Sequence, residues 1–514
     1  MKRAIFSMAI FLLAVCYSNV SWANAVDPIV QVDHPYIMAN VKSPVYVLVQ
    51  FNVTSVKEDP AKPRPKLNLA LVIDRSGSMA ERGKLEYAKK AANIVVDKMK
   101  PSDRIAIIEY DDRINVLWPS YPAESPEMIK RTIMTLTPRG STNLTGGMMK
   151  GVEEALKNTG KNYINRVILL SDGLANRGIT NPLEIRRLVR ESKSKGVHIS
   201  TMGLGLNYNE DLLQAIAENA GGNYYFIESP MQMGGIFQQE ISILFASVTK
   251  DIKMKFYPGD VVTKVDVFGY PSIQDEGVIT IEQEDFYSNE TRSLLVRLEV
   301  KPQEKGLRDL GKFNLTYMDL IDKKQKEIEK SISVQVTENA TKVKKEENKK
   351  VLVESTLIEA DQNHENFMKM YEKGNKDEAI RRIKNLEEKL STQNKILSDM
   401  QIAKKIEALK MEAMEMEEAE ISQQNRAAYL KKSKLRFYQS QKGKRGKYIL
   451  KEGDTGYEVK RLQSNLRLKG FYKGPVDGNF TSEVTDAVKS FQKQNNLSDD
   501  GIAGPATLKA LGSY

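Results

Sequence analysis

Residues 67–78 read LNLALVIDRSGS, and this stretch decides the fold of the central part of the chain. Its first seven residues are nearly all apolar, as expected for a strand buried on both faces of a sheet. Asp74, Ser76 and Ser78 follow where the strand gives way to a polar loop. Because open α/β sheets gather ligand-binding groups at the carboxyl ends of their strands, the stretch predicts both a buried strand and a site.

Two later segments supply groups of the same kind. Thr142 lies in the loop GSTNL of residues 140–144, and Asp172 follows the apolar run of residues 167–170. The three segments together offer two carboxylates and three hydroxyls, which suit Mg²⁺, with Ca²⁺ or Mn²⁺ as the alternatives. Two carboxylates only balance the charge of such an ion, so it could still accept a carboxylate from outside. The alternative is that DRSGS is a serine-rich turn satisfying backbone groups.

This set of residues resembles the metal-ion-dependent adhesion site of von Willebrand factor A domains, in which D-x-S-x-S is followed by a Thr and later by an Asp. All five positions of that pattern are matched here. The resemblance implies that Ser76, Ser78 and Thr142 are hydroxyl ligands. It also implies that Asp74 and Asp172 act directly or through water, and that an Asp or Glu of a protein partner fills the last position.

The remaining pattern of residues 26–337 predicts two domains. Residues 66–248 alternate short apolar strands with helical stretches, which indicates a Rossmann-like α/β domain with a mostly parallel sheet. Residues 249–337 change to period-2 patterns, as in VITI at 278–281, which predict a β-sandwich. The strand region 26–60 has no other obvious partner, so we expect it to join the sandwich and leave the A domain as an insertion.

A second resemblance implies the same arrangement. The sequence DRSGSM at residues 74–79 and the β region that follows resemble bacterial A-domain proteins of the calcium-activated-chloride-channel-like family. The channel function in that family's name is not expected here, because no segment reaches the roughly 18 apolar residues of a transmembrane helix.

Two charged regions follow the sandwich. Residues 341–424 are rich in Lys and Glu and carry apolar residues at helical spacing, such as Ile380, Ile383 and Leu386, which predicts an α-helical spacer, either an α-hairpin or a short coiled coil. Residues 425–447 become strongly basic from Lys431 onward and predict a flexible linker. Such a linker is either a solvated tether or a segment attracted to anionic envelope polymers or lipid head groups.

Residues 448–514 resemble the peptidoglycan-binding domain type 1. The resemblance rests on two Asp-Gly turns, DGNF at 477–480 and DGIAGPAT at 500–507, each leading into a helix. It implies a small three-helix bundle that binds peptidoglycan through unknown residues of the module carrying Asp477, Gly478, Asp500 and Gly501. The first turn has Thr481 where Gly is usual and Val484 where Thr is usual, so a protein ligand is the alternative.

The N-terminus predicts export. Residues 1–25 combine a basic start, an apolar stretch and small residues before two candidate cleavage sites, as in a secretory signal peptide. We therefore expect a secreted protein of the periplasm or cell wall. The single cysteine, Cys16, lies in this segment, so cleavage would leave no disulfide and no thiol catalysis. Lipidation at Cys16 is the alternative.

Composition and scattered residues argue against other classes. The balance of 77 Lys+Arg against 67 Asp+Glu gives a net charge of +10, too mild over 514 residues to indicate nucleic acid. The histidines His34, His198 and His364 are too scattered to predict a zinc hydrolase. Ser76 replaces the second Asp of the phosphatase pattern D-x-D-x-T, so the proton donor of that chemistry is missing.

These observations predict a binding protein without enzymatic activity. It would capture an acidic residue of a protein partner through a divalent metal and attach to peptidoglycan through its C-terminal module. The alternatives are a cell-envelope scaffold in which the metal only stabilises the fold, or an accessory subunit of a cell-wall hydrolase. The sequence does not indicate the partner or the oligomeric state.

Overall fold

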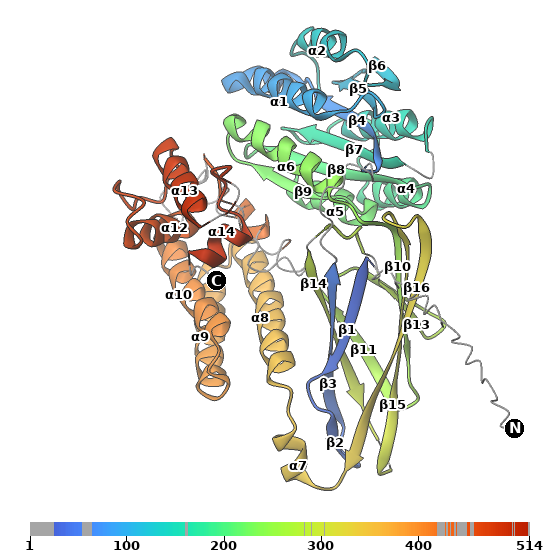
Figure 1. Cartoon of the computed structure of the whole chain (residues 1–514), viewed down its shortest axis with the longest axis vertical. Coiled ribbons are helices and arrows are strands. Elements are labelled where there is room, and N and C mark those ends of the chain that lie inside the picture. The colour runs from blue at the N-terminus through green and yellow to red at the C-terminus, as the bar shows by residue number, and fades with distance from the viewer. Residues whose placement is uncertain are drawn as a thin grey trace, which may run out of the picture.

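The computed structural model describes residues 25–53, 64–159 and 163–418 apart from 282, 289 and 303, then positions 427, 430, 431, 433–435 and 438, and residues 450–511 apart from 453–456, 496 and 498. The predicted signal peptide lies outside the described residues except for its last position. Figure 1 shows an α/β domain above a β-sandwich, with a helical region and the C-terminal module beside them.

The α/β domain is built on a six-stranded sheet in the order β6-β5-β4-β7-β8-β9. Its strands are β4 (Lys66–Asp74), β5 (Arg104–Tyr110), β6 (Ile114–Pro122), β7 (Tyr163–Ser171), β8 (Val197–Leu204) and β9 (Tyr224–Ile227). All neighbouring pairs are parallel except β5 with the edge strand β6. The chain runs outward from β4 to β5 and β6 and then returns to β7 on the other side of β4, so the carboxyl ends of β4 and β7 form the topological switch point of the sheet.

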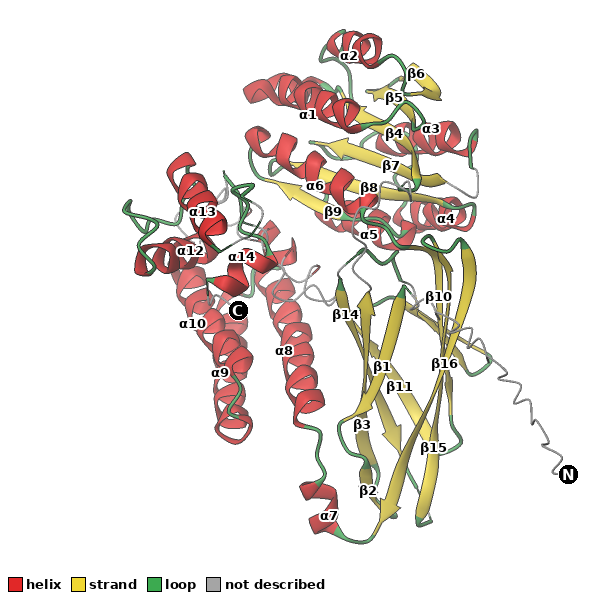
Figure 2. Cartoon of the chain, in the orientation of Figure 1, coloured by secondary structure: helices red, strands yellow, loops and turns green. Residues whose placement is uncertain are grey.

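Helices cover both faces of this sheet (Figure 2). One face packs against α1 (Lys84–Lys98), α2 (Pro126–Met134) and α6 (Met233–Phe245), and the other against α3 (Leu144–Leu156), α4 (Pro182–Ser194) and α5 (Glu210–Ala220). The apolar run of β4 serves both cores, because Leu69 and Leu71 point to the first and Ala70 and Val72 to the second. The predicted α/β fold is confirmed, although the sequence pattern did not predict β6, α2 or α6.

The β-sandwich is built from strands that precede the α/β domain in the sequence and strands that follow it. One sheet contains β1 (Val26–Val32), β3 (Ser43–Val53), β14 (Thr291–Val300) and β11 (Val262–Phe268). The other contains β12 (Ser272–Asp275), β13 (Val278–Ile281), β10 (Thr249–Pro258), β15 (Gly306–Asp319), β16 (Lys324–Thr337) and β2 (Tyr36–Met38). Because β3 pairs with β14 in antiparallel register, the α/β domain is an insertion within the sandwich.

The helical region after the sandwich is a packed cluster. It contains α7 (Ala340–Lys345), α8 (Lys349–Glu372), α9 (Lys376–Leu397) and α10 (Met400–Glu418). The last three helices share a core that includes Leu357, Ile383 and Leu409. Helix α8 also buries Val351 against Leu48 and Leu295 of the sandwich. The prediction of a simple hairpin spacer was therefore incomplete, since one helix belongs partly to the sandwich surface.

Part of the predicted flexible linker is folded onto the α/β domain. We call its described contact residues, Leu430, Lys431, Ser433, Lys434, Leu435 and Tyr438, the docking segment; all of them are helical. Leu430 belongs to the core of the helical cluster, whereas Tyr438 belongs to a core of the α/β domain and Leu435 packs against it. The prediction of a flexible, solvated linker was wrong for these residues, because apolar side chains between the lysines find buried partners.

Ion pairs hold the lysines of the docking segment. The ammonium of Lys431 lies 3.9 Å from the centre of the Tyr208 ring and pairs with Glu210. Lys434 Nζ lies 3.2 Å from the same carboxylate and 2.8 Å from Glu372 of α8. The segment therefore bridges the helical cluster and the start of α5.

The C-terminal module is a small helical bundle of α12 (Tyr457–Leu468), α13 (Ser482–Gln494) and α14 (Pro505–Ala510). Its core includes Leu462, Val488 and Phe491. Across all the residues that the structure describes, no helix is both long and apolar enough to span a bilayer.

Candidate metal centre

Asp74 is the last residue of β4 and is fully buried. The strand that carries it lies between two parallel neighbours: Ile73 pairs with both, and Asp74 pairs with Tyr110 of β5. This backbone pairing positions the carboxylate. Beyond it, the Arg75 N–H donates to the Tyr110 carbonyl at 2.9 Å, and the Ser76 N–H donates to Asp74 Oδ1 at 2.8 Å. The serine turn therefore folds back over the end of its own strand.

The structure brings the five predicted side chains together. Ser76 Oγ lies 3.1 Å from Ser78 Oγ, and Ser78 Oγ donates to Asp172 Oδ1 at 2.7 Å. A methyl group built on Gly173 would lie 3.4 Å from Thr142 Oγ1 and 3.9 Å from Ser78 Oγ. Oxygens from three separate loops thus share one small volume at the switch point of the sheet.

Glycines allow this close approach of the loops. The Gly77 N–H donates to the Gly140 carbonyl at 3.1 Å, which joins the serine turn to the loop of Thr142. Gly140 has a φ of +74°, and a Cβ there would lie only 2.2 Å from Asp112 Oδ1. A side chain at position 140 would therefore strain the backbone and displace the loop that carries Thr142.

Burial and a neighbouring charge perturb the Asp74 carboxyl. Its burial, and then the charge of Asp172, raise the pKa of Asp74 to about 6. Ser171 Oγ donates to Asp74 Oδ2 at 3.0 Å, and the Tyr110 hydroxyl lies 3.2 Å from the same oxygen. Because the negative charge of Asp172 opposes ionisation of the buried Asp74 carboxyl, a bound cation would stabilise the ionised form of Asp74.

The residues present fit a hard divalent cation. All five side chains offer oxygen, and the set contains neither the imidazole nor the thiolate that zinc prefers. Asp74 and Asp172 are buried, whereas Ser78 is partly exposed and Gly77 is exposed. The carboxylates therefore form the floor of the site, and the serine turn lies at its mouth.

Sequence reasoning missed the charged residues around this centre. Arg75 is buried and pairs with Glu109 at 2.7 Å and Asp111 at 3.0 Å, which ties the serine turn to β5. Lys84 Nζ lies 2.6 Å from Asp172 Oδ2. Neither contact has a local sequence signal, because each joins residues separated by more than a whole secondary-structure element.

The three histidines lie in separate parts of the structure. His34 pairs with Asp33 in the sandwich, and His364 is buried in α8. His198 lies in β8, with its Nδ1 3.1 Å from the Gly221 carbonyl. Its burial, and then the charge of Arg166, lower the pKa of His198 to about 3. No group of three or more His, Cys, Asp or Glu side chains within the described residues is arranged to hold a metal.

In the C-terminal module, the two predicted Asp-Gly turns are held by buried glutamines. Gln463 Oε1 accepts from the Gly478 N–H at 2.8 Å, and Gln463 Nε2 donates to Asp477 Oδ1 at 2.9 Å. This contact and the turn amides lower the pKa of Asp477 to about 2.

The second turn repeats the arrangement. Gln492 Oε1 accepts from the Gly501 N–H at 2.9 Å, and its Nε2 donates to Asp500 Oδ1 at 2.8 Å. The four predicted turn residues therefore have structural roles, and Gln463 and Gln492 are the residues that sequence reasoning missed.

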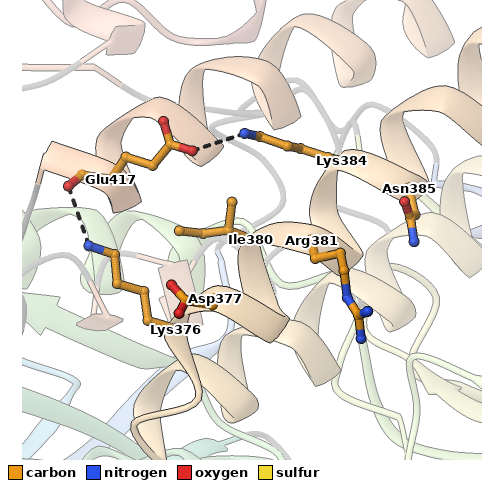
Figure 3. Close-up of a pocket in the computed structure, with 7 residues that line it drawn as sticks. All are labelled: Lys376, Asp377, Ile380, Arg381, Lys384, Asn385 and Glu417. Atoms are coloured by element: carbon orange, nitrogen blue, oxygen red, sulfur yellow. Dashed lines mark hydrogen bonds and ion pairs between the residues drawn. The ribbon is translucent and has the colours of Figure 1, made fainter.

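A groove between α9 and α10 belongs to the packing of the helical cluster. Figure 3 shows Lys376 and Lys384 of α9 reaching Glu417 of α10. Lys384 Nζ lies 2.9 Å from Glu417 Oε1, and Lys376 Nζ donates to the Glu417 carbonyl at 3.3 Å. These contacts join the two helices across the groove.

Comparison with known proteins gives two family matches. The model of the von Willebrand factor type A domain matches residues 68–239, and that of the peptidoglycan binding domain matches residues 455–511. The first match contains all five residues of the candidate metal centre. The second contains both glutamine-held turns.

Curated relatives match the chain over part of its length. "Uncharacterized protein YfbK" of Escherichia coli is 32% identical over 221 residues, which are 42% of this chain and 38% of that protein. "Uncharacterized protein sll0103" of Synechocystis is 26% identical over 275 residues, 52% of this chain and 64% of that protein. Human inter-alpha-trypsin inhibitor heavy chain H3 is 26% identical over 42% of this chain and 25% of its own length. The chain thus spans less than two thirds of these relatives.

Solved structures share the fold at low sequence identity. A von Willebrand factor type A protein from Catenulispora acidiphila aligns with a TM-score of 0.60 and 17% identity, over 72% of this chain and 87% of that one. The ArnB paralog VWA2 of Sulfolobus acidocaldarius aligns with a TM-score of 0.53 and 16% identity, over 81% and 98%. From the fold, the clustered oxygens and both family matches, we conclude that the chain carries a von Willebrand factor type A domain followed by a domain of the peptidoglycan-binding family.

Proposed function

We propose that this protein is an exported binding protein that captures an acidic residue of a protein partner at a bound divalent metal ion. Mg²⁺ is the proposed metal. The observation that carries the proposal is the convergence of Asp74, Ser76, Ser78, Thr142 and Asp172 at the switch point of the sheet. When bound, the metal would supply an electrophilic centre for a carboxylate ligand.

The chain's own residues set the binding properties of this centre. Asp74 and Asp172 provide negative charge from the buried floor, and the neutral hydroxyls of Ser76, Ser78 and Thr142 add oxygen donors without further charge. Two carboxylates leave the charge of a divalent ion no more than balanced. A partner's Asp or Glu can then approach from the exposed side at Gly77.

We propose that binding, rather than catalysis, is the role of the centre. Ser76 stands where the aspartyl phosphatases need a second Asp, and its Oγ is engaged with Ser78 Oγ. The buried carboxylate that lies beside Asp74 is Asp172, on the loop after β7, and it is held by Ser78 and Lys84. Neither Ser76 nor Asp172 is therefore free to donate a proton to a leaving group.

We further propose that the C-terminal module attaches the protein to peptidoglycan. The family match over residues 455–511 supports this role. Removing the chain from residue 448 onward should abolish sedimentation with purified sacculi. Sacculus binding that survives this truncation would contradict the role of the module.

A pull-down from envelope extract tests the metal-dependent role. Purified protein is compared in Mg²⁺ and in EDTA, with Asp74→Ala as the site variant and Asp97→Ala, at an exposed position of α1, as its matched control. We expect a partner that is captured by wild type and D97A in Mg²⁺ and lost in EDTA and with D74A. Capture that persists in EDTA would contradict the proposal and favour a scaffold in which a metal only stabilises the fold.

A further inference from the structure

Lys84 is a buried cation built into the wall of the metal centre. It is the first residue of α1, and only 10% of its side chain is exposed. Its Nζ lies 2.6 Å from Asp172 Oδ2 and 3.3 Å from the Ser78 carbonyl. Glu81, a further carboxylate 3.6 Å away, is about two-thirds exposed, so Asp172 is the buried partner.

The local backbone directs Lys84 toward the site. Arg82 and Gly83 both have positive φ values, +49° and +68°, and they turn the chain at the end of η1 (Gly77–Gly83), directly before α1. This turn lets the first side chain of the helix return to the serine turn. The ammonium thus contacts both a predicted metal ligand and the backbone of another.

Asp172 is shared between two kinds of partner. Its Oδ1 accepts from the Ser78 hydroxyl at 2.7 Å, and its Oδ2 is held by Lys84. Because a buried ammonium needs a counter-charge, part of the negative charge of Asp172 is already balanced before a metal enters. The centre therefore offers a divalent cation less than two full negative charges.

We infer that Lys84 lowers the affinity of the centre for its divalent cation and, by doing so, strengthens capture of an external carboxylate by the loaded centre. Both effects follow from one positive charge, which repels the cation and leaves the loaded site more positive toward an incoming anion. This inference rests on the proposed function, and in it Lys84 acts through its charge rather than by orienting Asp172.

Lys84→Met separates charge from side-chain length. We expect K84M to bind Mn²⁺ roughly tenfold more tightly than wild type, as an order-of-magnitude effect of removing one nearby charge. Binding is measured by the loss of the free Mn²⁺ signal in electron paramagnetic resonance. Lys84→Arg keeps the charge and should stay near wild type. Lys89→Met, which removes a cation paired with Glu86 on the same helix, is the matched control.

Acetate serves as the external carboxylate in the second measurement. Its displacement of metal-bound water is followed by water-proton relaxation in the Mn²⁺-loaded protein. We expect K84M to need several-fold more acetate than wild type, with K84R and K89M close to wild type.

The outcomes distinguish this inference from the proposed function. If K84M binds Mn²⁺ more weakly than wild type, Lys84 only orients Asp172 and the inference is overturned. Tighter Mn²⁺ binding with unchanged acetate affinity would also overturn it. If wild type and D74A both fail to bind Mn²⁺ at millimolar concentration, the proposed function itself fails.

Discussion

At the scale of single residues, the candidate centre depends on hydroxyl groups that each have a defined neighbour. Ser78 is the clearest case, since its Oγ contacts Ser76 Oγ and donates to Asp172 Oδ1. It therefore both offers a donor oxygen and orients a carboxylate. Loss of this one oxygen should weaken metal binding more than it weakens folding.

Ser78→Ala should reduce Mg²⁺ affinity by about tenfold, while the free energy of unfolding without metal changes by about 1 kcal/mol. Isothermal titration with Mg²⁺ and denaturant unfolding in EDTA measure the two quantities. Ser194→Ala, at an exposed position at the end of α4, is the control. An S78A protein that binds Mg²⁺ as tightly as wild type would remove Ser78 from the ligand set.

His198 gives the protein a pH dependence of stability with a definite sign. Its pKa is about 3 in the folded protein because of burial and the charge of Arg166, compared with an ordinary value near 6.5. The unfolded chain therefore binds a proton below about pH 6.5 that the folded chain does not, and stability falls as pH decreases through this range.

Replacing His198 by Gln removes this contribution to the pH dependence of stability. We expect the stability of wild type relative to H198Q to fall by about 2 kcal/mol between pH 7 and pH 5. Urea unfolding of both proteins at the two pH values measures it. If the stability of wild type relative to H198Q stays constant between pH 7 and pH 5, or increases toward pH 5, His198 is charged in the folded protein.

The five oxygen residues could be predicted from the sequence, whereas their surroundings could not. Asp74, Ser76 and Ser78 form a local pattern, and Thr142 and Asp172 each follow a recognisable loop or strand. Lys84, Tyr110 and Ser171 act through contacts that exist only once the sheet order is fixed. Residues of common types that come into contact only in the tertiary structure have no characteristic spacing in the sequence, so their contacts could not be predicted.

At the scale of elements, the docking segment is the main difference between expectation and structure. The basic composition after Lys431 predicts a solvated linker, because composition does not show which apolar residues will be buried. Tyr438 is the decisive residue: its hydroxyl accepts from the Tyr224 N–H at 3.2 Å and lies 3.2 Å from the Gly222 carbonyl. Its ring meets that of Tyr224 edge to face at 5.8 Å.

Tyr438→Ala should therefore destabilise the α/β domain by about 3 kcal/mol, whereas Tyr438→Phe, which loses only the hydroxyl, should cost about 1 kcal/mol. Denaturant unfolding, together with hydrogen exchange measured in β9, tests the effect. Tyr121→Ala, with 56% of the residue exposed, is the control. Equal unfolding curves for Y438A and Y121A would show that the segment does not contribute to this domain.

Strands and helices with strong periodicity were predictable, and edge elements were not. Strands β4, β5, β7 and β9 contain apolar runs because both faces of a parallel sheet are covered. Strand β8 is equally buried, although His198, Ser200 and Thr201 interrupt its apolar residues. Edge strand β6 is only partly buried and has no such run. Helix α6 packs against the sheet beside α1, and its amphipathic period is weak.

At the scale of the whole molecule, a bound cation should stabilise the protein through the α/β domain. With Mg²⁺ at about 100 times its dissociation constant, the expected gain is about 2.7 kcal/mol. This gain corresponds to an increase of roughly 5–10 °C in the melting temperature of a domain of this size. Differential scanning calorimetry in Mg²⁺ and in EDTA measures it, and D74A should show no increase. An equal increase in D74A would place the stabilising ion elsewhere.

Because the α/β domain is inserted between β3 and β10, the stability of the sandwich depends on whether the inserted domain is folded. When the inserted domain is folded, it holds the ends of these strands within reach of each other. When it is unfolded, the sandwich must close a long disordered loop, at an entropic cost on the order of 5 kcal/mol. A core substitution such as Ile168→Ala in β7 should therefore also speed hydrogen exchange in β3 and β14. Damage near the metal centre would in this way loosen a sheet that the centre does not touch.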